Sequence, residues 1–283
     1  MGKVSLKGII DMHVHTAPDI RVRPYNDLQM MDVAVKTGAR AIVIKSHHGP
    51  TMNRAFLVNE VNKRIHNGDN DFTMFGSITL NYDVGGLNPV AVESALKMGA
   101  KVVWLPTTHA VNQLQKKGKA GGIQCTSNGK IVEPLKEILK MIKDYDAVCG
   151  TGHLSPEEIF TVVDAAKGMG LKKVVITHPE FWVVGLTHEQ QYQLVNDYDV
   201  YLEKTYAQPM GGGVYKKNLP DNFEVMKNLN CKNIIISTDS GQMENPRWEE
   251  SLPEYLQYLS DHGITDDQLE TMTRKTQSML LGL

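Results

Sequence analysis

The sequence predicts an α/β fold of the (β/α)8 barrel class, and three observations carry this prediction. Apolar runs of strand type alternate with amphipathic stretches along the chain, a pattern typical of parallel strands joined by helical crossovers. Three copies of one helix-to-strand join contain a Gly that ends the helix, in Lys36–Ile44, Lys97–Leu105 and Lys167–Ile176. The 283 residues suffice for one barrel, which needs about 250.

Taken in order, the apolar runs give eight strands, and eight strand–helix units favour a closed barrel over an open sheet. An open doubly wound sheet is the alternative, but no Gly-x-Gly-x-x-Gly follows the first strand and no Walker sequence occurs. The expected strands are Gly8–His15, Ala41–His47, Phe72–Leu80, Lys101–Leu105, Ala147–His153, Lys173–His178, Asp199–Thr205 and Asn233–Asp239.

The helices between these strands are predicted from apolar stripes and from capping residues. Leu28, Met31 and Val35 follow helical spacing, as do Leu57, Val61 and Ile65, and we interpret such stripes as core. Helix starts are expected at Thr51, Asn88–Pro89, Ser155–Glu158, Thr187–Gln190 and Thr265–Gln268.

Two connections are longer than a plain strand-to-helix join. The one after the fourth strand contains Asn128-Gly129 within Ile123–Val132, which predicts a hairpin with a type I′ turn. The one after the seventh strand contains Pro209–Gly213 and has neither a helical nor a strand pattern. Both follow strands, so they are candidate lids over an active site, or solvated connections without special purpose.

Composition restricts the class of partner. The net charge is −2 and Lys and Arg are dispersed, which argues against a nucleic acid or an anionic membrane surface. No apolar run approaches the roughly 18 residues of a membrane span. Three scattered cysteines fit a reduced, cytoplasmic protein. We therefore expect one domain over residues 1–283 that acts on a small molecule, with a possible homo-oligomer through the C-terminal helices around Leu256 and Leu280.

Side chains that bind metals stand at the carboxyl ends of several expected strands. In Asp11-Met-His-Val-His15, alternation along a strand puts His13 and His15 on one face, with Asp11 deeper on the same face as an orienting carboxylate. Lys45 and His47, His153, His178 and Asp239 end four further strands. In a barrel these ends converge on one pocket.

This arrangement resembles the amidohydrolase superfamily, whose fold is a distorted TIM barrel with His-x-His on strand one. His13, His15, His153, His178 and Asp239 match that family's ligands in order and by strand. The resemblance implies a divalent ion, Zn²⁺ or Mn²⁺, held by His13, His15 and Asp239, with Asp239 also accepting a proton. With two ions, His153 and His178 bind the second; with one ion, His153 joins the first site and His178 polarises the substrate.

The chain departs from the family at the fourth strand, where binuclear members carry a bridging Lys or Glu. Here Val102–His109 contains neither residue. Lys45 is a substitute if it is carboxylated, and Glu203 could supply a carboxylate directly. The other interpretation of Lys45 is an ammonium that binds an anionic substrate or pairs with Asp239.

Further residues are candidates for substrate binding. They are His47, Arg21, Arg23, His109, Glu203 and Tyr206. Arg21 and Arg23 would clamp a carboxylate or phosphate, or they are ordinary surface charges. The resemblance implies a hydrolase of C–N or C–O bonds. The alternatives are a metal-dependent decarboxylase or lyase on the same barrel, and a barrel that binds metal or ligand without turnover.

Overall fold

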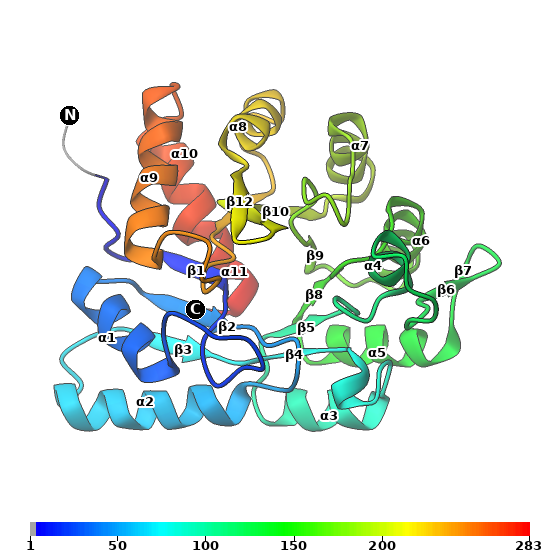
Figure 1. Ribbon diagram of the computed structural model, residues 1–283, viewed down its shortest axis with the longest axis horizontal. Coiled ribbons are helices and arrows are strands. Elements are labelled where there is room, and N and C mark those ends of the chain that lie inside the picture. The colour runs from blue at the N-terminus through cyan, green and yellow to red at the C-terminus, as the bar shows by residue number, and fades with distance from the viewer. Residues whose placement is uncertain (1–3) are drawn as a thin grey trace. The chain divides into compact units, whose positions relative to one another are not determined.

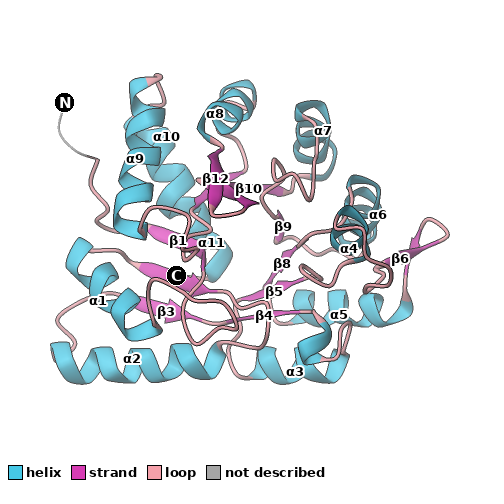
Figure 2. Cartoon of the chain, in the orientation of Figure 1, coloured by secondary structure: helices cyan, strands magenta, loops and turns pink. Residues whose placement is uncertain are grey.

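The computed structural model of the protein describes residues 4–283. Contacts between residues divide the chain into two compact units. The first comprises the chain up to Lys45, Thr51–Gly76 and Lys204–Leu283, and the second comprises Ser46–Pro50 and Ser77–Glu203. In both, strands alternate with helices along the sequence (Figure 2). The single domain expected over residues 1–283 stays a prediction.

The first unit contains a parallel sheet in the order β1-β2-β3, with the three strands side by side in Figure 1. An isolated bridge between Val14 and Ser240 places the end of β13 beside β1. These strands are almost wholly buried, as expected for parallel strands covered on both faces. Their bounds are β1 Ile10–Val14, β2 Ala41–Ile44, β3 Thr73–Phe75 and β13 Ile234–Ser237.

The helices of the first unit follow their strands in sequence. Their bounds are α1 Asp27–Thr37, α2 Met52–His66, α8 Leu219–Asn228, α9 Trp248–Asp261, α10 Asp266–Glu270, the π-helical turn η2 Thr271–Lys275, and α11 Thr276–Leu281. Helix α1 has a capping box at Asn26 and ends at Gly38, whose φ of 76° is the left-handed conformation expected there.

Helices α1 and α2 both correct predictions about the core. Leu28 of α1, interpreted as core, is 44% exposed. Leu57 and Ile65, interpreted as core from their spacing, are 63% and 59% exposed. The buried face is instead formed by Met52, Ala55, Val58 and Asn62. The side chain of Thr51 also makes no capping hydrogen bond; its hydroxyl donates to the carbonyl of Ile44.

The second unit contains a parallel sheet in the order β10-β9-β8-β5-β4. Strand bounds are β4 Ser77–Thr79, β5 Val102–Trp104, β8 Val148–Gly150, β9 Val174–Ile176 and β10 Tyr201–Thr205, the last of which continues into the first unit. Helix bounds are the 3₁₀ turn η1 Tyr82–Val84, α3 Pro89–Lys97, α4 Val111–Lys116, α5 Glu133–Asp144, α6 Pro156–Gly168 and α7 His188–Tyr198.

All eight expected strands are present, and the third is divided in two. Strands β3 and β4 are separated by Gly76, where a Cβ atom would lie 2.4 Å from the Cα of Met52. The close approach of α2 therefore requires Gly at this position. The expected helix starts at Asn88, Ser155, Thr187 and Thr265 are confirmed, since each side chain accepts a backbone N–H of its own helix.

Both long connections form hairpins. Strands β6 (Thr126–Ser127) and β7 (Lys130–Ile131) pair antiparallel around Asn128 and Gly129, whose φ values of 53° and 70° confirm the type I′ turn. The other connection was expected to lack strands. It forms β11 (Ala207–Gly211) and β12 (Val214–Lys217), which pair antiparallel. Three consecutive glycines with positive φ form the turn between these strands. They also interrupt the strand pattern of the sequence, so the hairpin was not predicted.

None of the helices in residues 4–283 combines the length and the apolar character that crossing a bilayer requires.

The three thiols are expected to be unreactive in the folded protein. Cys125, Cys149 and Cys231 are buried and free of disulfides. Burial raises the pKa of the Cys149 thiol to about 12 and that of Cys231 to about 11, so the reactive thiolate is scarce at pH 8. Titration with a chromogenic disulfide should detect three thiols in denaturant and almost none without it. Rapid reaction of one thiol in the native protein would contradict this burial.

Candidate metal centre

Strand β1 delivers two buried imidazoles to one point. His13 and His15 are 0% and 1% exposed, and their spacing of two places both on one face of the chain. Their Nε2 atoms lie 3.3 Å apart. Two imidazole nitrogens at this separation, with no room for water between them, are suited to sharing a third partner.

Asp239 provides that partner from the turn after β13. Its Oδ1 lies 3.1 Å from the Nε2 atoms of both His13 and His15. No hydrogen bond of normal geometry reaches this buried oxygen from residues 4–283. We call His13, His15 and Asp239 the His–His–Asp cluster; their ligand atoms all lie within 4.8 Å of one another. Two imidazole nitrogens and a carboxylate oxygen are a donor set for Zn²⁺, so the cluster fits the expected metal.

The electrostatics favour the metal-binding forms of His15 and Asp239. Burial lowers the pKa of His15 to about 3, assisted by the positive charge of Arg23, so the imidazole is neutral at pH 7. Burial opposes the charge of Asp239, but His13 and His15 beside it hold the pKa of this carboxyl well below its usual range. Metal binding requires neutral imidazole and ionised carboxylate.

Asp11 holds the backbone around the cluster. Its carboxylate accepts hydrogen bonds from the N–H of His13 (3.0 Å), the hydroxyl of Thr238 (2.7 Å) and the indole N–H of Trp248 (2.9 Å). Burial raises the pKa of Asp11 to about 6, against the effect of these donors. Asp11 was expected to orient the imidazoles. Its hydrogen bonds instead fix β1 against the end of β13 and against α9.

Lys45 lies against the same cluster from the end of β2. It is 1% exposed, its backbone N–H donates to the carbonyl of Val14 (2.9 Å), and its Nζ lies 3.1 Å from the Nε2 of His13. The structure thus brings Lys45 to His13, as expected from the convergence of the strand ends. Its carboxylation stays a prediction.

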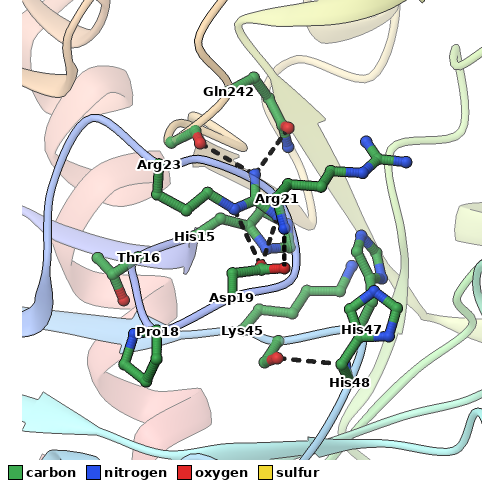
Figure 3. Close-up of polar contacts among 12 residues, drawn as sticks. His15, Thr16, Pro18, Asp19, Arg21, Arg23, Lys45, His47, His48 and Gln242 are labelled. Atoms are coloured by element: carbon green, nitrogen blue, oxygen red, sulfur yellow. Dashed lines mark hydrogen bonds and ion pairs between the residues drawn. The ribbon is translucent and has the colours of Figure 1, made fainter. Parts of the chain in front are cut away.

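Arg23 is a buried connector and not a surface charge. Its guanidinium donates to Asp19 through Nε and Nη2 (2.9 and 2.7 Å), and to Gly241 O and Gln242 Oε1 through Nη1 (2.9 and 2.7 Å). The loop after β1 is thereby joined to the loop after β13 (Figure 3). Arg21 differs, because it is exposed and its side chain extends away from the Arg23–Asp19 pair.

We expect Arg23→Lys to destabilise the protein, because a lysine cannot reproduce the planar fork that reaches three acceptors. The expected loss in the free energy of unfolding is about 1–3 kcal/mol, measured by urea denaturation. Arg21→Lys is the matched control and should change stability by less than about 0.5 kcal/mol. Equal effects of the two substitutions would show that the Arg23 contacts contribute nothing specific.

The second unit contains a cluster of its own, formed by His47, His153 and His178. The ring centroids of His47 and His153 lie 5.9 Å apart, and those of His153 and His178 lie 4.9 Å apart. The Nδ1 of His153 lies 2.7 Å from Gln113 Oε1, so it donates to this oxygen and leaves a lone pair on Nε2, as in metal-bound histidines. His178 has a φ of 26° and stacks on Phe181 at 4.0 Å.

Three other predicted site residues lie in different surroundings. His109 is partly exposed, its ring is tilted against that of Tyr82 with centroids 4.8 Å apart, and its Nδ1 lies 3.6 Å from Asp83 Oδ2. The buried Tyr206 donates its hydroxyl to Glu254 at 2.7 Å. Glu203 is fully buried on β10. Their roles in substrate binding stay predictions, as does the expectation of a single pocket.

Sequence reasoning missed the residues that support the ligands. Trp248 donates to Asp11, and Gln113 accepts from His153. Asn81 and Thr107 bind His47 through its carbonyl and ring. No local pattern marks these residues, because each partner is distant in the chain.

Solved structures share this fold across nearly the whole chain. An amidohydrolase from Pseudomonas aeruginosa is 15% identical with a TM-score of 0.66, covering 97% of this chain and 95% of that one. Enamidase, described as a new member of the amidohydrolase superfamily, is 12% identical with a TM-score of 0.57, covering 98% of this chain and 68% of that one. 2,6-Dihydroxybenzoate decarboxylase is 9% identical with a TM-score of 0.55, covering 98% of this chain and 100% of that one.

These likenesses confirm the fold that the sequence predicts, the amidohydrolase-type (β/α)8 barrel class. No curated protein matches the chain. One family model matches residues 8–203, which is more than half of the chain and includes every candidate ligand except Asp239. The chain therefore belongs to the family of unknown function DUF6282.

Proposed function

We propose that this protein is a metal-dependent hydrolase that cleaves a C–N or C–O bond of a small molecule, such as an amide, cyclic amide, lactone or ester. The observation that carries the proposal is the buried His–His–Asp cluster at the ends of β1 and β13. The fold shared with an amidohydrolase and with enamidase supports it.

His13, His15 and Asp239 would hold the metal, for which we propose Zn²⁺, with Mn²⁺ as the alternative. When bound, such an ion supplies Lewis acidity and makes water acidic near neutral pH. Asp239, ionised because its pKa lies well below the usual range, would accept the proton of the attacking water and return it to the leaving group. Asp11 keeps the backbones of His13 and Thr238 fixed during this exchange.

A decarboxylase is the second candidate, and one observation favours it. The residues that follow β5, from Leu105 to Thr108, include no carboxylate and no lysine, so this strand offers no bridging group for a second ion. A decarboxylase is among the proteins that share the fold. Both reactions would use the same His–His–Asp cluster.

The first experiment is elemental analysis of protein purified without chelator. We expect at least one equivalent of a divalent metal per chain, and we expect His13→Ala to lose it on dialysis. His188→Ala is the control, because this residue begins α7 outside both clusters. A second equivalent would indicate a bridging group and direct attention to Lys45. A wild-type protein that binds no metal after reconstitution would disprove the proposal.

The bond that breaks separates the two candidate reactions. The metal-loaded protein should be assayed on a panel of amides, cyclic amides, lactones and esters, and on aromatic carboxylic acids with detection of released CO₂. Hydrolysis that disappears with the metal supports the hydrolase. Release of CO₂ alone supports the decarboxylase, and binding without turnover on both panels supports a ligand-binding barrel.

A further inference from the structure

The ring of His47 belongs to a chain of hydrogen bonds that starts at Asn81. Asn81 is fully buried at the end of β4, and its Oδ1 accepts the backbone N–H groups of Thr107 (2.9 Å) and His109 (3.2 Å). Both partners of Oδ1 are obligate donors, so the orientation of the amide is fixed. Its Nδ2 group therefore donates, to the carbonyl of His47 (3.0 Å) and to Thr107 Oγ1 (2.7 Å).

The orientation of the Asn81 amide also determines which atom donates in the hydrogen bond between Thr107 and His47. Thr107 is fully buried, and its Oγ1 has two recorded partners, Nδ2 of Asn81 and Nδ1 of His47 at 2.8 Å. Because Asn81 donates, the hydroxyl hydrogen of Thr107 can be accepted only by Nδ1 of His47. A proton on Nδ1 would leave this buried hydroxyl hydrogen without an acceptor among residues 4–283, which is costly.

His47 is thus held as the neutral tautomer with its proton on Nε2. The neighbouring His153 has the opposite tautomer, because its Nδ1 donates to Gln113. Two histidines whose rings are 5.9 Å apart therefore present different chemistry: His153 offers a lone pair for a cation, and His47 offers an N–H for an oxygen. The two supporting residues, Thr107 and Gln113, impose this difference.

We infer that His47 is a hydrogen-bond donor to an acceptor oxygen of the substrate, a carboxylate, phosphate or carbonyl oxygen, and is not a metal ligand. Asn81 and Thr107 are positioning residues that fix its tautomer. The identity of the acceptor as the substrate rests on the proposed function, whereas the tautomer does not. The need for a fixed donor on His47 also explains why the buried Thr107 and Asn81 are hydrogen-bonded on the Nδ1 side of its ring.

The tautomer is measured by ¹⁵N NMR on protein labelled at its ten histidines, since protonated and unprotonated ring nitrogens have well-separated shifts. His47→Gln identifies the His47 signals by their loss. We expect Nε2 protonated in the wild type and in Thr107→Ser, which keeps the hydroxyl. Thr107→Val should shift the proton toward Nδ1. In Asn81→Asp, the introduced carboxylate accepts the hydroxyl hydrogen of Thr107, which reverses the direction of both hydrogen bonds. The Thr107 oxygen then accepts from His47, so this substitution should place the proton on Nδ1.

Binding of inorganic phosphate tests the donor role on the same labelled samples. Phosphate should perturb the His47 Nε2 signal, and Thr107→Val should weaken its affinity about tenfold, the usual effect of one hydrogen bond to a charged group. Thr107→Ser, which keeps the hydroxyl, should stay within about threefold of the wild type. A wild-type proton on Nδ1, or equal phosphate affinities of Thr107→Val and Thr107→Ser, would overturn the inference.

The result is distinguishable from failure of the proposed function. An Nδ1 tautomer in protein that carries metal and hydrolyses a substrate overturns the role of His47 alone. The expected tautomer and phosphate response in protein that binds no metal overturn the hydrolase and leave His47 as an oxyanion donor.

Discussion

Asparagine in place of Asp239 is expected to lower kcat about 10²- to 10⁴-fold, the range for loss of a general base, with the fold intact. The substitution keeps an oxygen near His13 and His15 but removes the charge that accepts a proton and attracts a cation. Metal affinity should fall as well. The measurement is kcat at saturating metal on whichever substrate the panel identifies, together with thermal unfolding of the same samples.

The backbone at residue 239 makes this substitution informative. Asp239 has a φ of 52°, and Asn tolerates this left-handed conformation at least as well as Asp. Asp239→Asn therefore tests charge without adding strain. Asp32→Asn, at an exposed position of α1, controls for loss of a carboxylate elsewhere. Unchanged turnover in metal-loaded Asp239→Asn would remove the residue from proton transfer and leave it, at most, as a ligand.

The strands and their ends were predictable because both follow from short-range patterns. Apolar runs bounded by Gly and polar residues mark buried parallel strands, and the period of two puts His13 and His15 together without any knowledge of the fold. Asp239 required one more step, the expectation that strand ends gather on one side of a sheet. The His–His–Asp cluster shows that this step was correct for β1 and β13.

Helix α2 shows where the same reasoning fails. Its sequence carries two possible inner faces, and the more apolar one, with Leu57 and Ile65, is exposed. The face that packs inward includes Asn62, whose amide donates to the carbonyl of Phe72 and pairs with Asn70. A polar side chain counts against burial in a periodicity argument, although in the structure Asn62 is satisfied by residues of the turn that follows α2 and of the segment before β3.

The buried position of Arg23 could not be predicted either, for a related reason. Its acceptors Gly241 and Gln242 are 218 and 219 residues away, so a sequence pattern cannot distinguish it from the exposed Arg21 two positions earlier. Supporting residues of this kind are fixed by tertiary contacts. They become visible only when the loops after β1 and β13 are placed beside each other.

Alanine in place of Gly241, beside the His–His–Asp cluster, is expected to destabilise the protein strongly. A Cβ atom at this position would lie 1.9 Å from the carbonyl oxygen of His15 and 2.7 Å from its carbonyl carbon. Both atoms belong to backbone that cannot rotate away, and Ser240 O already accepts the N–H of His15 at 2.8 Å. We expect a loss of more than about 4 kcal/mol in the free energy of unfolding, measured by urea denaturation.

Gly263→Ala separates the clash from backbone strain. Gly241 and Gly263 have similar φ values, 102° and 95°, but a Cβ at residue 263 would meet nothing within 4 Å. Strain alone costs about 1–2 kcal/mol, so Gly263→Ala should lose that much and Gly241→Ala at least twice as much. Folded Gly241→Ala should also bind metal more weakly, because relief of the clash must displace His15. Equal losses in the two variants would mean that residues 240–241 do not lie against His15, and the support inferred for the His–His–Asp cluster would be wrong.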